Sequence, residues 1–160
     1  MACVILILGS NLGNRHRYLE DARRLVESYI GIVNQNSSIY ETEPWGFIDE
    51  NLFLNQVMEI DTILDPLGVL NEIKKIELQL GRIRANERYG ARTIDIDILF
   101  YNDLIINTPE LIIPHPEMIK RRFVLEPLSE IVAPRIHPVY SKSIENLLSE
   151  CQDICKVARV

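Results

Sequence analysis

The chain has 160 residues, of which 47% are hydrophobic and 25% are charged, and its formal net charge is −6. This length and composition favour one globular domain over residues 1–160 and exclude a disordered chain. The acidic balance opposes nonspecific binding to nucleic acid or to an anionic membrane. There is no apolar run long enough to span a bilayer, and the first residues match a strand pattern, so we expect no secretion signal. We therefore expect a cytoplasmic monomer whose partners are small molecules.

The hydrophobic pattern and the turn residues predict an ordered series of elements, beginning with a strand and a helix. Gly31 is expected to end the first helix. Asp65 and Pro66 supply an N-cap and a first helical residue for the second helix, which Gly81 ends. The buried stripe of this second helix is expected to contain Leu67, Leu70, Ile73, Ile76 and Leu80. The predicted strands cover residues 4–8, 32–40, 53–61 and 93–101, and the predicted helices cover 15–30 and 66–80.

The order βαββαβ predicts an α+β, ferredoxin-like fold with a sheet that contains antiparallel strands and is covered by helices. We expect four strands, covered on one face, with each helix crossing between parallel neighbours by a right-handed connection. The last sixty or so residues are rich in proline, with short helices expected at 120–127 and 143–151. They are interpreted as a C-terminal elaboration of the same domain.

The three cysteines are an odd number in a chain with no export signal, which favours reduced thiols over a disulfide framework. Cys3 is expected to pack in the first strand. Cys151 and Cys155 have no accompanying His or Cys that would complete a zinc site, so no metal role is expected for them.

One short run, residues 82–99, combines four arginines with two aspartates. With the two-residue period of a strand, Asp95 and Asp97 point to one face, while the intervening isoleucines and Phe100 point to the other. The Cα atoms of the two aspartates would lie about 7 Å apart, so both carboxylates can converge on one hard cation or share two. Arginines alone are typical of a solvated loop, but neighbouring carboxylates repel unless a cation or arginine neutralises them. The run therefore predicts a site for a polyphosphate and its metal.

Several other side chains suit such a site. Glu77 lies at the edge of a buried stripe, where an unpaired carboxylate is costly, so it should have a polar partner, either a ligand or an arginine. His115 could donate to an oxyanion, although a hydrogen bond within its own loop is the simpler alternative. Phe53 and Asn55 share one face of their strand, which suits a flat heterocycle with donors and acceptors on its edge. Phe123 is equally typical of a core residue.

The turn Gly9-Ser10-Asn11-Leu12-Gly13-Asn14 follows a strand and opens a helix, which is where phosphate-binding loops lie. It lacks the lysine of a P-loop and the third glycine of a dinucleotide fingerprint. A tight turn with Asn14 as the N-cap is the favoured interpretation.

Taken together, these motifs resemble the 6-hydroxymethyl-7,8-dihydropterin pyrophosphokinase family of folate biosynthesis. The resemblance runs in order from Val4 to about Ala133. The matching segments are residues 41–46 (ETEPWG), 53–55 (FLN), 76–77 (IE), 81–84 (GRIR), 88–98 (RYGARTIDIDI), 114–116 (PHP) and 121–125 (RRFVL).

The resemblance implies transfer of pyrophosphate from ATP to the hydroxymethyl group of the pterin, with release of AMP. It also implies two Mg²⁺ ions held by Asp95 and Asp97. The implied catalytic residues are Arg82, Arg92, Asp95 and Asp97. The implied ATP-binding residues are Glu77, Arg82, Arg84, Arg88, Arg92, Ile98, His115 and Arg121. The implied pterin-binding residues are Thr42, Pro44, Trp45, Phe53, Asn55 and Phe123.

Two alternatives stay open at this point. The D-x-D pattern alone would also suit another metal-dependent nucleotidyl or phosphoryl transferase on a ferredoxin-like scaffold. A regulatory module of the same fold would bind a small ligand and give no turnover with ATP and Mg²⁺. The candidate pterin-pocket residues favour the pyrophosphokinase.

Overall fold

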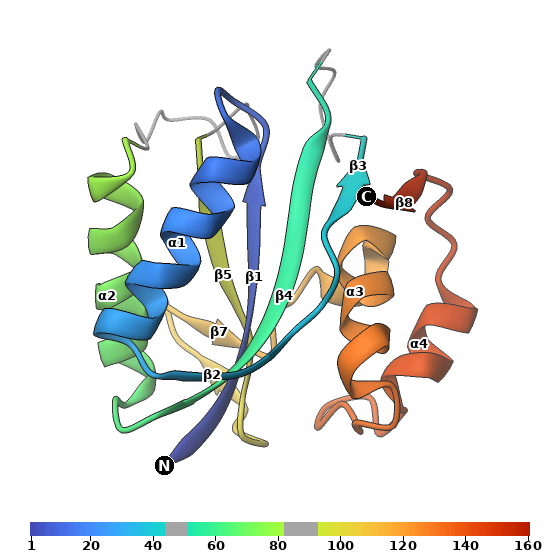
Figure 1. The fold of residues 1–160 in the computed structure, drawn as a ribbon. Helices are drawn as coiled ribbons and strands as arrows, with labels where there is room; N and C mark the ends of the chain where they lie inside the picture. Colours follow the sequence, from blue (N-terminus) through green and yellow to red (C-terminus); the bar gives the residue numbers. More distant parts are fainter. Residues whose placement is uncertain (44–50, 82–92) are drawn as a thin grey trace.

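The computed structural model describes residues 1–43, 51–81 and 93–160. Its elements follow the expected order and continue into a helical C-terminal part (Figure 1). The strands are β1 (Ala2–Ser10), β2 (Ile32–Asn36), β3 (Tyr40–Thr42), β4 (Phe53–Thr62), β5 (Asp95–Tyr101), β6 (Ile106–Asn107), β7 (Ile112–Ile113) and β8 (Val157–Arg159). The helices are α1 (Arg15–Tyr29), α2 (Pro66–Gln79), the 3-10 helix η1 (Met118–Lys120), α3 (Arg122–Val132) and α4 (Ile144–Glu150).

The main sheet has six strands in the order β5-β1-β4-β3-β8, with β2 also paired to β4. This is the ferredoxin-like arrangement predicted from the sequence, extended at one edge by β8. Every pair recorded among the described strands is antiparallel. The expectation that each helix joins parallel neighbours is therefore wrong, because β4 lies between β1 and β2, and β1 lies between β4 and β5.

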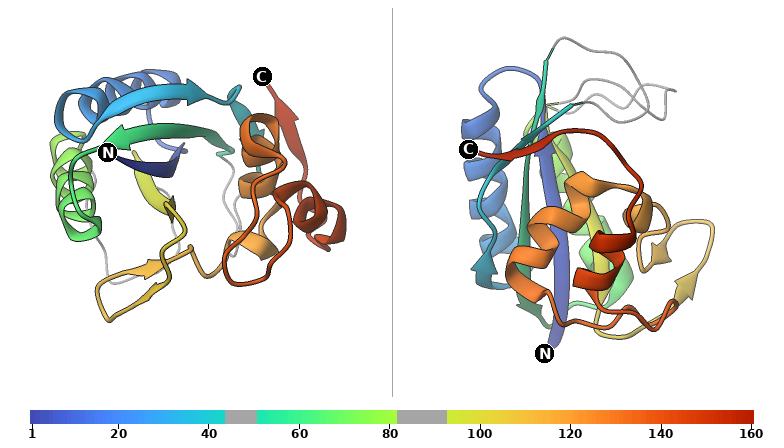
Figure 2. Two further views of the ribbon diagram at one scale, coloured as in Figure 1. Left: turned by 90° about the horizontal axis from the view of Figure 1, so that it is seen from below. Right: turned by 90° about the vertical axis from the view of Figure 1, so that its right-hand side faces the viewer.

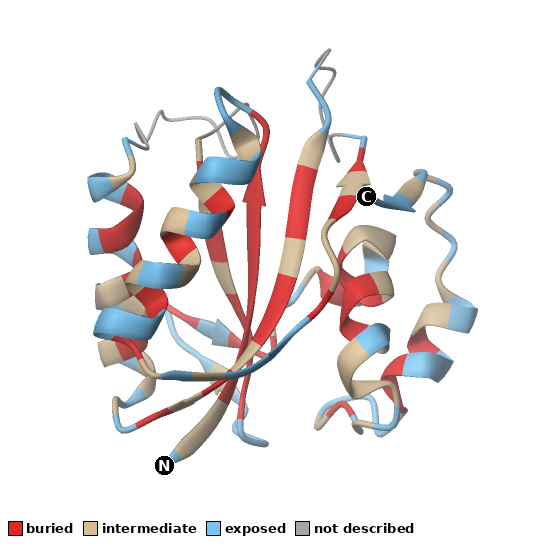
Figure 3. Ribbon diagram, in the orientation of Figure 1, coloured by how far each residue is buried: buried red, intermediate tan, exposed pale blue. Residues whose placement is uncertain are grey.

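Helices cover both faces of the sheet, not one as expected (Figures 1 and 2). Side chains of α1 and α2 pack against one face, with Leu6, Leu8 and Ile96 in the same core cluster. Side chains of α3 and α4 pack against the other face, around Ile5 and Phe100. Consecutive residues along the central strand β1 are accordingly buried (Figure 3). The C-terminal part therefore completes the second half of the core, as well as elaborating the fold.

The helix starts follow the sequence closely. The side chain of Asn14 accepts a hydrogen bond from the Arg17 N–H, and that of Asp65 accepts one from Gly68. These bonds satisfy backbone donors that the first helical turn leaves free. In α2 the buried stripe is shifted from the expected one, because Val69 is fully buried whereas Leu67 is 51% exposed.

Close packing explains the glycine after α1. A Cβ at Gly31 would lie 2.1 Å from the carbonyl oxygen of Asp61 on β4. Only glycine lets the chain leave the helix so near the sheet.

A bulge in the β1–β5 pairing changes the faces expected for the end of β5. Ile5 pairs with Phe100 and Leu6 pairs with Ile98, so the register shifts between these two positions. Phe100 therefore joins Leu99 in the core beneath α3 and α4, although strict alternation placed it with the isoleucines. The shift lies beyond Asp95 and Asp97 and leaves their common face unchanged.

The expected strand 32–40 is divided into β2 and β3. Between them, Ser37 donates its N–H to the Val57 carbonyl and accepts the Val57 N–H with its hydroxyl, at 2.8 and 3.0 Å. The hydroxyl thus replaces a backbone partner and lets the chain bend without leaving a buried group unpaired. Within the described ranges, no helix is long and apolar enough to cross a membrane.

Candidate active site

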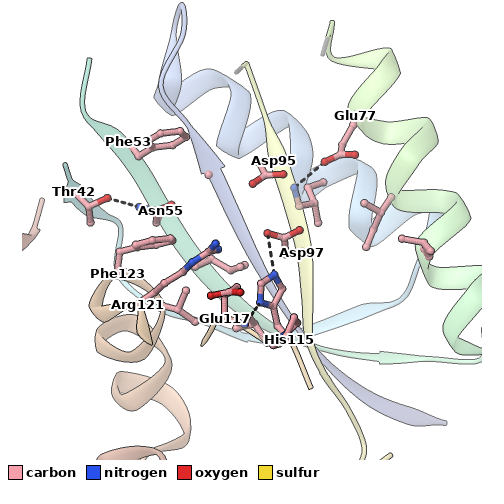
Figure 4. Close-up of a pocket in the computed structure, with 18 of the residues that line it drawn as sticks. Thr42, Phe53, Asn55, Glu77, Asp95, Asp97, His115, Glu117, Arg121 and Phe123 are labelled. Atoms are coloured by element: carbon pink, nitrogen blue, oxygen red, sulfur yellow. Dashed lines mark hydrogen bonds and ion pairs between the residues drawn. The ribbon is translucent and has the colours of Figure 1, made fainter. Parts of the chain in front are cut away.

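A pocket of about 570 Å³ opens where β5, β1 and β4 meet the start of α3 and the side of α2. This volume falls within the range of roughly 300–1,000 Å³ typical of small-molecule sites. Its lining comes from elements and loops that are far apart in the sequence (Figure 4). The lining residues used below are Gly9, Thr42, Phe53, Asn55, Glu77, Asp95, Asp97, His115, Glu117, Arg121 and Phe123.

Asp95 and Asp97 both line the pocket from β5, as the strand period predicted. Figure 4 shows both carboxylates on the pocket side of that strand. They are held next to β1, where Gly9 pairs with Asp95 and Ile7 pairs with Asp97. The side chain of Asp97 is 38% exposed. The two carboxylates are therefore fixed by the sheet but accessible from the pocket.

His115 lies beside these carboxylates on the segment between β7 and η1. Its backbone N–H donates to the carbonyl of Leu99 on β5, which ties the segment to the sheet. Its Nδ1 accepts the backbone N–H of Glu117 at 3.2 Å. The neutral ring therefore carries its proton on Nε2, which lies 3.9 Å from Asp97 Oδ2. The simpler alternative for this histidine, a hydrogen bond within its own loop, is confirmed, whereas donation from Nε2 to an oxyanion stays a prediction.

The opposite side of the pocket carries an amide and two aromatic rings. Asn55 is 3% exposed, and its Nδ2 donates to Thr42 Oγ1 at 2.8 Å. In Figure 4, Phe53 from β4 and Phe123 from α3 lie on either side of this amide. The guanidinium of Arg121 lies 5.8 Å from the centre of the Phe123 ring. Phe123 also packs against the core beneath α3, so its two interpretations are compatible.

Glu77 reaches the pocket from α2, on the far side of β5. It is 2% exposed, and its Oε2 accepts the backbone N–H of Ile96 at 3.0 Å. The buried carboxylate thus has a polar partner, as expected, and one such partner is the backbone of β5. The sequence pattern did not identify this partner. The bond joins α2 to the strand that carries both aspartates.

The structure does not bring every predicted site residue to the pocket. Ile98 is 5% exposed and belongs to the core beneath α1 and α2, and it is not among the residues that line the pocket. Pro44, Trp45, Arg82, Arg84, Arg88 and Arg92 lie outside the described residues.

Sequence reasoning missed several lining residues, among them Gly9, Lys74 and Glu117. Lys74 is one turn before Glu77 on α2, so helical spacing from Glu77 could have identified it. Glu117 follows the Pro-His-Pro motif directly. The sequence pattern assigns Gly9 only to a turn, and its place in the site follows from strand register.

The acidic pair suits a magnesium ion better than a closed metal centre. In residues 1–43, 51–81 and 93–160, no group of three or more His, Cys, Asp or Glu side chains could hold a metal ion. Mg²⁺ commonly takes one or two carboxylates and completes its shell with phosphate oxygens and water. Asp95 and Asp97 fit that donor set.

The thiols have no comparable arrangement. All three cysteines are free, and burial raises the pKa of Cys3 and of Cys155. Asp153 raises the pKa of Cys155 further. Both thiols therefore stay protonated near neutral pH, which does not suit a nucleophile or a metal ligand.

Comparisons with known proteins converge on one family. The model of the family described as 7,8-dihydro-6-hydroxymethylpterin-pyrophosphokinase matches residues 5–133. The 2-amino-4-hydroxy-6-hydroxymethyldihydropteridine pyrophosphokinase of Bacillus subtilis is 47% identical over 127 residues, which cover 79% of this chain and 75% of the relative. Its counterpart from Aquifex aeolicus is 42% identical over 150 residues, which cover 94% and 92%.

Solved structures agree on the fold. The crystal structure of wild-type Plasmodium falciparum HPPK-DHPS is similar with a TM-score of 0.78 and 22% identity, over 93% of this chain and 44% of that chain. An HPPK-DHPS in complex with substrates gives a TM-score of 0.76 and 20% identity, over 93% and 43%. The chain thus spans less than half the length of these solved chains.

Proposed function

The chain belongs to the 7,8-dihydro-6-hydroxymethylpterin pyrophosphokinase family, and from that premise we propose how its residues carry out the reaction. The family transfers pyrophosphate from ATP to the hydroxymethyl group of 6-hydroxymethyl-7,8-dihydropterin and releases AMP, in folate biosynthesis. We further propose that residues 1–160 act as one catalytic domain and as a monomer. The cytoplasmic location stays a prediction from the sequence.

The observation that carries the proposal is that one pocket joins two chemically different halves. One half presents the carboxylates of Asp95 and Asp97 and the Nε2 of His115. The other presents a buried amide, Asn55, near two aromatic rings. A phosphate-bearing substrate suits the first half and a planar heterocycle suits the second, so one site can hold both reactants together.

In the pterin half, we propose that Phe53 and Phe123 stack on the two faces of the ring. Asn55 would bond to the polar edge of the pterin, because its bond to Thr42 already fixes the orientation of the amide. Such prior fixing reduces the entropy lost on binding. Thr42 belongs to the same subsite, and Pro44 and Trp45, which lie outside the described residues, are predicted to complete it.

In the phosphate half, Asp95 and Asp97 would hold the magnesium that accompanies ATP. When bound, this cation neutralises charge on the phosphate oxygens. His115 Nε2–H and the guanidinium of Arg121 would donate to those oxygens, and Arg82, Arg84, Arg88 and Arg92 are predicted to add further positive charge. Glu77 and Ile98 are proposed for the nucleotide end of the site, Glu77 from the pocket lining and Ile98 from the core behind it.

The chemical step needs positioning and charge stabilisation, and no covalent intermediate on the protein. The hydroxymethyl oxygen forms a bond to the β-phosphorus of ATP while the bond from that phosphorus to the α–β bridging oxygen breaks, so AMP leaves with the bridging oxygen and the hydroxyl proton is released to solvent. Phosphoryl transfer of this kind depends on in-line alignment and on donors around the phosphates. We propose that His115 acts as such a donor and is not an obligatory general base, since its Nδ1 is already occupied by Glu117.

A substrate-omission assay tests the proposal. The protein is incubated with ATP, Mg²⁺ and 6-hydroxymethyl-7,8-dihydropterin, and the nucleotides and pterins are separated by chromatography. We expect AMP and a pterin heavier by one pyrophosphate, both of which require all three components. Release of ADP or of free pyrophosphate would instead indicate another transferase, and the absence of turnover would indicate a regulatory module.

A further inference from the structure

Strand register places Asn55, Gly9 and Asp95 in one row across the sheet. Gly9 of β1 pairs with Asn55 of β4 on one side and with Asp95 of β5 on the other. All three residues line the pocket. One end of the row therefore carries the amide proposed for the pterin, the other end carries a carboxylate proposed for the metal (Figure 4), and the residue between them has no side chain.

The backbone at this position does not require glycine. Gly9 lies inside β1, and the glycines with positive φ in the described part of the chain are Gly13 and Gly81. Glycine in a strand interior weakens the strand, because it loses more entropy on folding and gives no side chain to pack. Glycine at position 9 therefore lowers the stability of β1, and the local backbone conformation gives no reason for its presence.

The space beside Gly9 is occupied by the Asn55 side chain. A Cβ at position 9 would lie 2.7 Å from Asn55 Oδ1 and 3.6 Å from Phe53 Cδ1. The first distance is too short for carbon and oxygen, whereas the second is ordinary contact. Asn55 is buried and bonded to Thr42, so its oxygen cannot move aside without disturbing that bond. A methyl group would thus displace the amide and leave the strand in place.

We infer that Gly9 is a positioning residue for pyrophosphate transfer. Its missing side chain sets where the Asn55 amide oxygen lies, and it keeps the floor of the pocket open between the pterin and the phosphates. The inference rests on the proposed function, because it takes Asn55 as a pterin contact and Asp95 as a metal ligand. The hydroxymethyl oxygen of the pterin must reach from the pterin half of the pocket to the β-phosphorus in the phosphate half, and Gly9 lies between the two halves.

Small displacements matter at such a place. In-line transfer requires the reacting atoms to approach to about 3–3.5 Å, so a pterin shifted by a fraction of that distance reacts poorly even when it is bound. A side chain at position 9 would shift the pterin through Asn55 and would also narrow the space the acceptor group crosses. Both effects would lower pterin affinity and the rate of transfer, and neither would directly change nucleotide affinity.

The variant Gly9→Ala tests the inference. Three quantities are measured: the dissociation constant of 6-hydroxymethyl-7,8-dihydropterin with Mg²⁺ and α,β-methylene-ATP present, the dissociation constant of that analogue alone, and steady-state turnover. We expect pterin binding to weaken at least tenfold and kcat/KM for pterin to fall at least a hundredfold. Analogue binding should stay within about twofold, and the melting temperature should stay within a few degrees of wild type.

Gly68→Ala is the matched control. Gly68 lies on α2 outside the pocket lining, and a Cβ there would lie 2.9 Å from the Asp65 Oδ1 oxygen, so the substitution creates a similar crowding of a side-chain oxygen. This variant should leave pterin binding and turnover unchanged. A double-mutant cycle with Asn55→Ala identifies the route: once the amide is removed, Gly9→Ala should weaken pterin binding much less than it does in wild type.

Two results would overturn the inference. Wild-type pterin affinity and turnover in Gly9→Ala would show that the space is not needed. Equal losses of pterin and analogue binding together with a large fall in melting temperature would show a purely structural role. Failure of the proposed function is distinct from both, since the wild-type protein would then produce no AMP from ATP and the pterin.

Discussion

At the scale of single residues, the site combines accessible groups with groups fixed by buried bonds. The Asp97 side chain is 38% exposed, whereas Asn55 and Glu77 are 3% and 2% exposed and hold defined partners. A metal and its phosphates must exchange with solvent, so accessible carboxylates suit them. Recognition of a heterocycle gains from an amide that cannot rotate.

Asp97→Asn is expected to reduce kcat/KM at least a hundredfold with little change in stability. The amide has the size of the carboxylate but lacks the charge that attracts a divalent cation, and a hundredfold loss corresponds to about 2.7 kcal/mol in the transition state. Steady-state kinetics over a range of Mg²⁺ concentrations measures it. Asp103→Asn, at an 86% exposed side chain just after β5, is the control. A loss smaller than tenfold would remove Asp97 from the metal site.

Phe123→Leu separates stacking from core packing. Leucine keeps most of the apolar volume beneath α3 but lacks a ring face, and an aromatic pair contributes about 0.5–1.5 kcal/mol beyond its buried area. Pterin binding should therefore weaken roughly tenfold, and ATP-analogue binding and the melting temperature should change little. Calorimetric titration and thermal melts decide between the roles, because unchanged pterin affinity with a lower melting temperature would make Phe123 a core residue only.

At the scale of elements, the start of α1 is linked directly to the strands that carry the pterin half. Arg15 Nη1 lies 3.0 Å from Glu41 Oε2 on β3 and donates to the carbonyl of Leu52 at 2.9 Å. Glu41 and Leu52 are immediate neighbours of Thr42 and Phe53, which pair across β3 and β4. One guanidinium therefore joins helix α1 to β3 and to the residue that precedes β4.

Arg15→Gln should weaken pterin binding several-fold and destabilise the fold by no more than about 1 kcal/mol. Ion pairs between partly exposed side chains contribute little to stability, but the variant frees the ends of β3 and β4 near Thr42 and Phe53. Arg24→Gln is the matched control, since Arg24 pairs with Glu20 on the same helix, away from those strands. Equal pterin affinities for the two variants, measured by titration, would show that the link is not needed.

Elements with a local cause were predictable from the sequence. Residues adjacent in the sequence were enough to predict the N-caps Asn14 and Asp65. They were also enough to predict the strand that holds Asp95 and Asp97. The break between β2 and β3 depends on the Ser37 hydroxyl meeting Val57, twenty residues away, and the bulge near Leu99 depends on the partner strand. Such features arise from tertiary contacts, which hydrophobic period does not encode.

At the scale of the whole molecule, the site depends on both cores. The core beneath α1 and α2 supports Glu77 on α2, and the core beneath α3 and α4 supports Phe123 on α3. Side-chain types and motifs identified these residues, but the pairing of β1 with both β4 and β5 was needed to show that Gly9 lies between the two halves. That pairing joins segments more than forty residues apart along the chain.

His137 should make stability depend on pH. It is 2% exposed, its Nδ1 accepts the N–H groups of Val139 and Tyr140, and burial, with a further effect of Arg135, lowers its pKa below the ordinary 6.5. The unfolded chain therefore binds a proton more readily, and the stability contributed by the neutral ring is lost as the pH falls from about 6.5 toward the folded pKa.

Urea unfolding at pH 7.5 and 5.5 measures this effect, and we expect a lower free energy of unfolding at pH 5.5. Hydrogen bonds hold the folded pKa values of Glu130 and Asp153 below the ordinary 4.5 and 3.8. These two carboxyl groups therefore add to the acid sensitivity of the fold only at lower pH. His16→Gln, at an exposed position on α1, should leave the difference in place. A free energy of unfolding that is the same at both pH values would contradict the assignment.

In the proposed reaction the pterin hydroxyl attacks the β-phosphorus of ATP within this pocket. This step is tested most directly with ATP that carries ¹⁸O in the α–β bridging position, by mass spectrometry of the products formed with Mg²⁺ and 6-hydroxymethyl-7,8-dihydropterin. Attack at the β-phosphorus breaks its bond to the bridging oxygen, so we expect the ¹⁸O to be retained in AMP. Label in free pyrophosphate, from attack at the α-phosphorus, or in ADP, from attack at the γ-phosphorus, would contradict it.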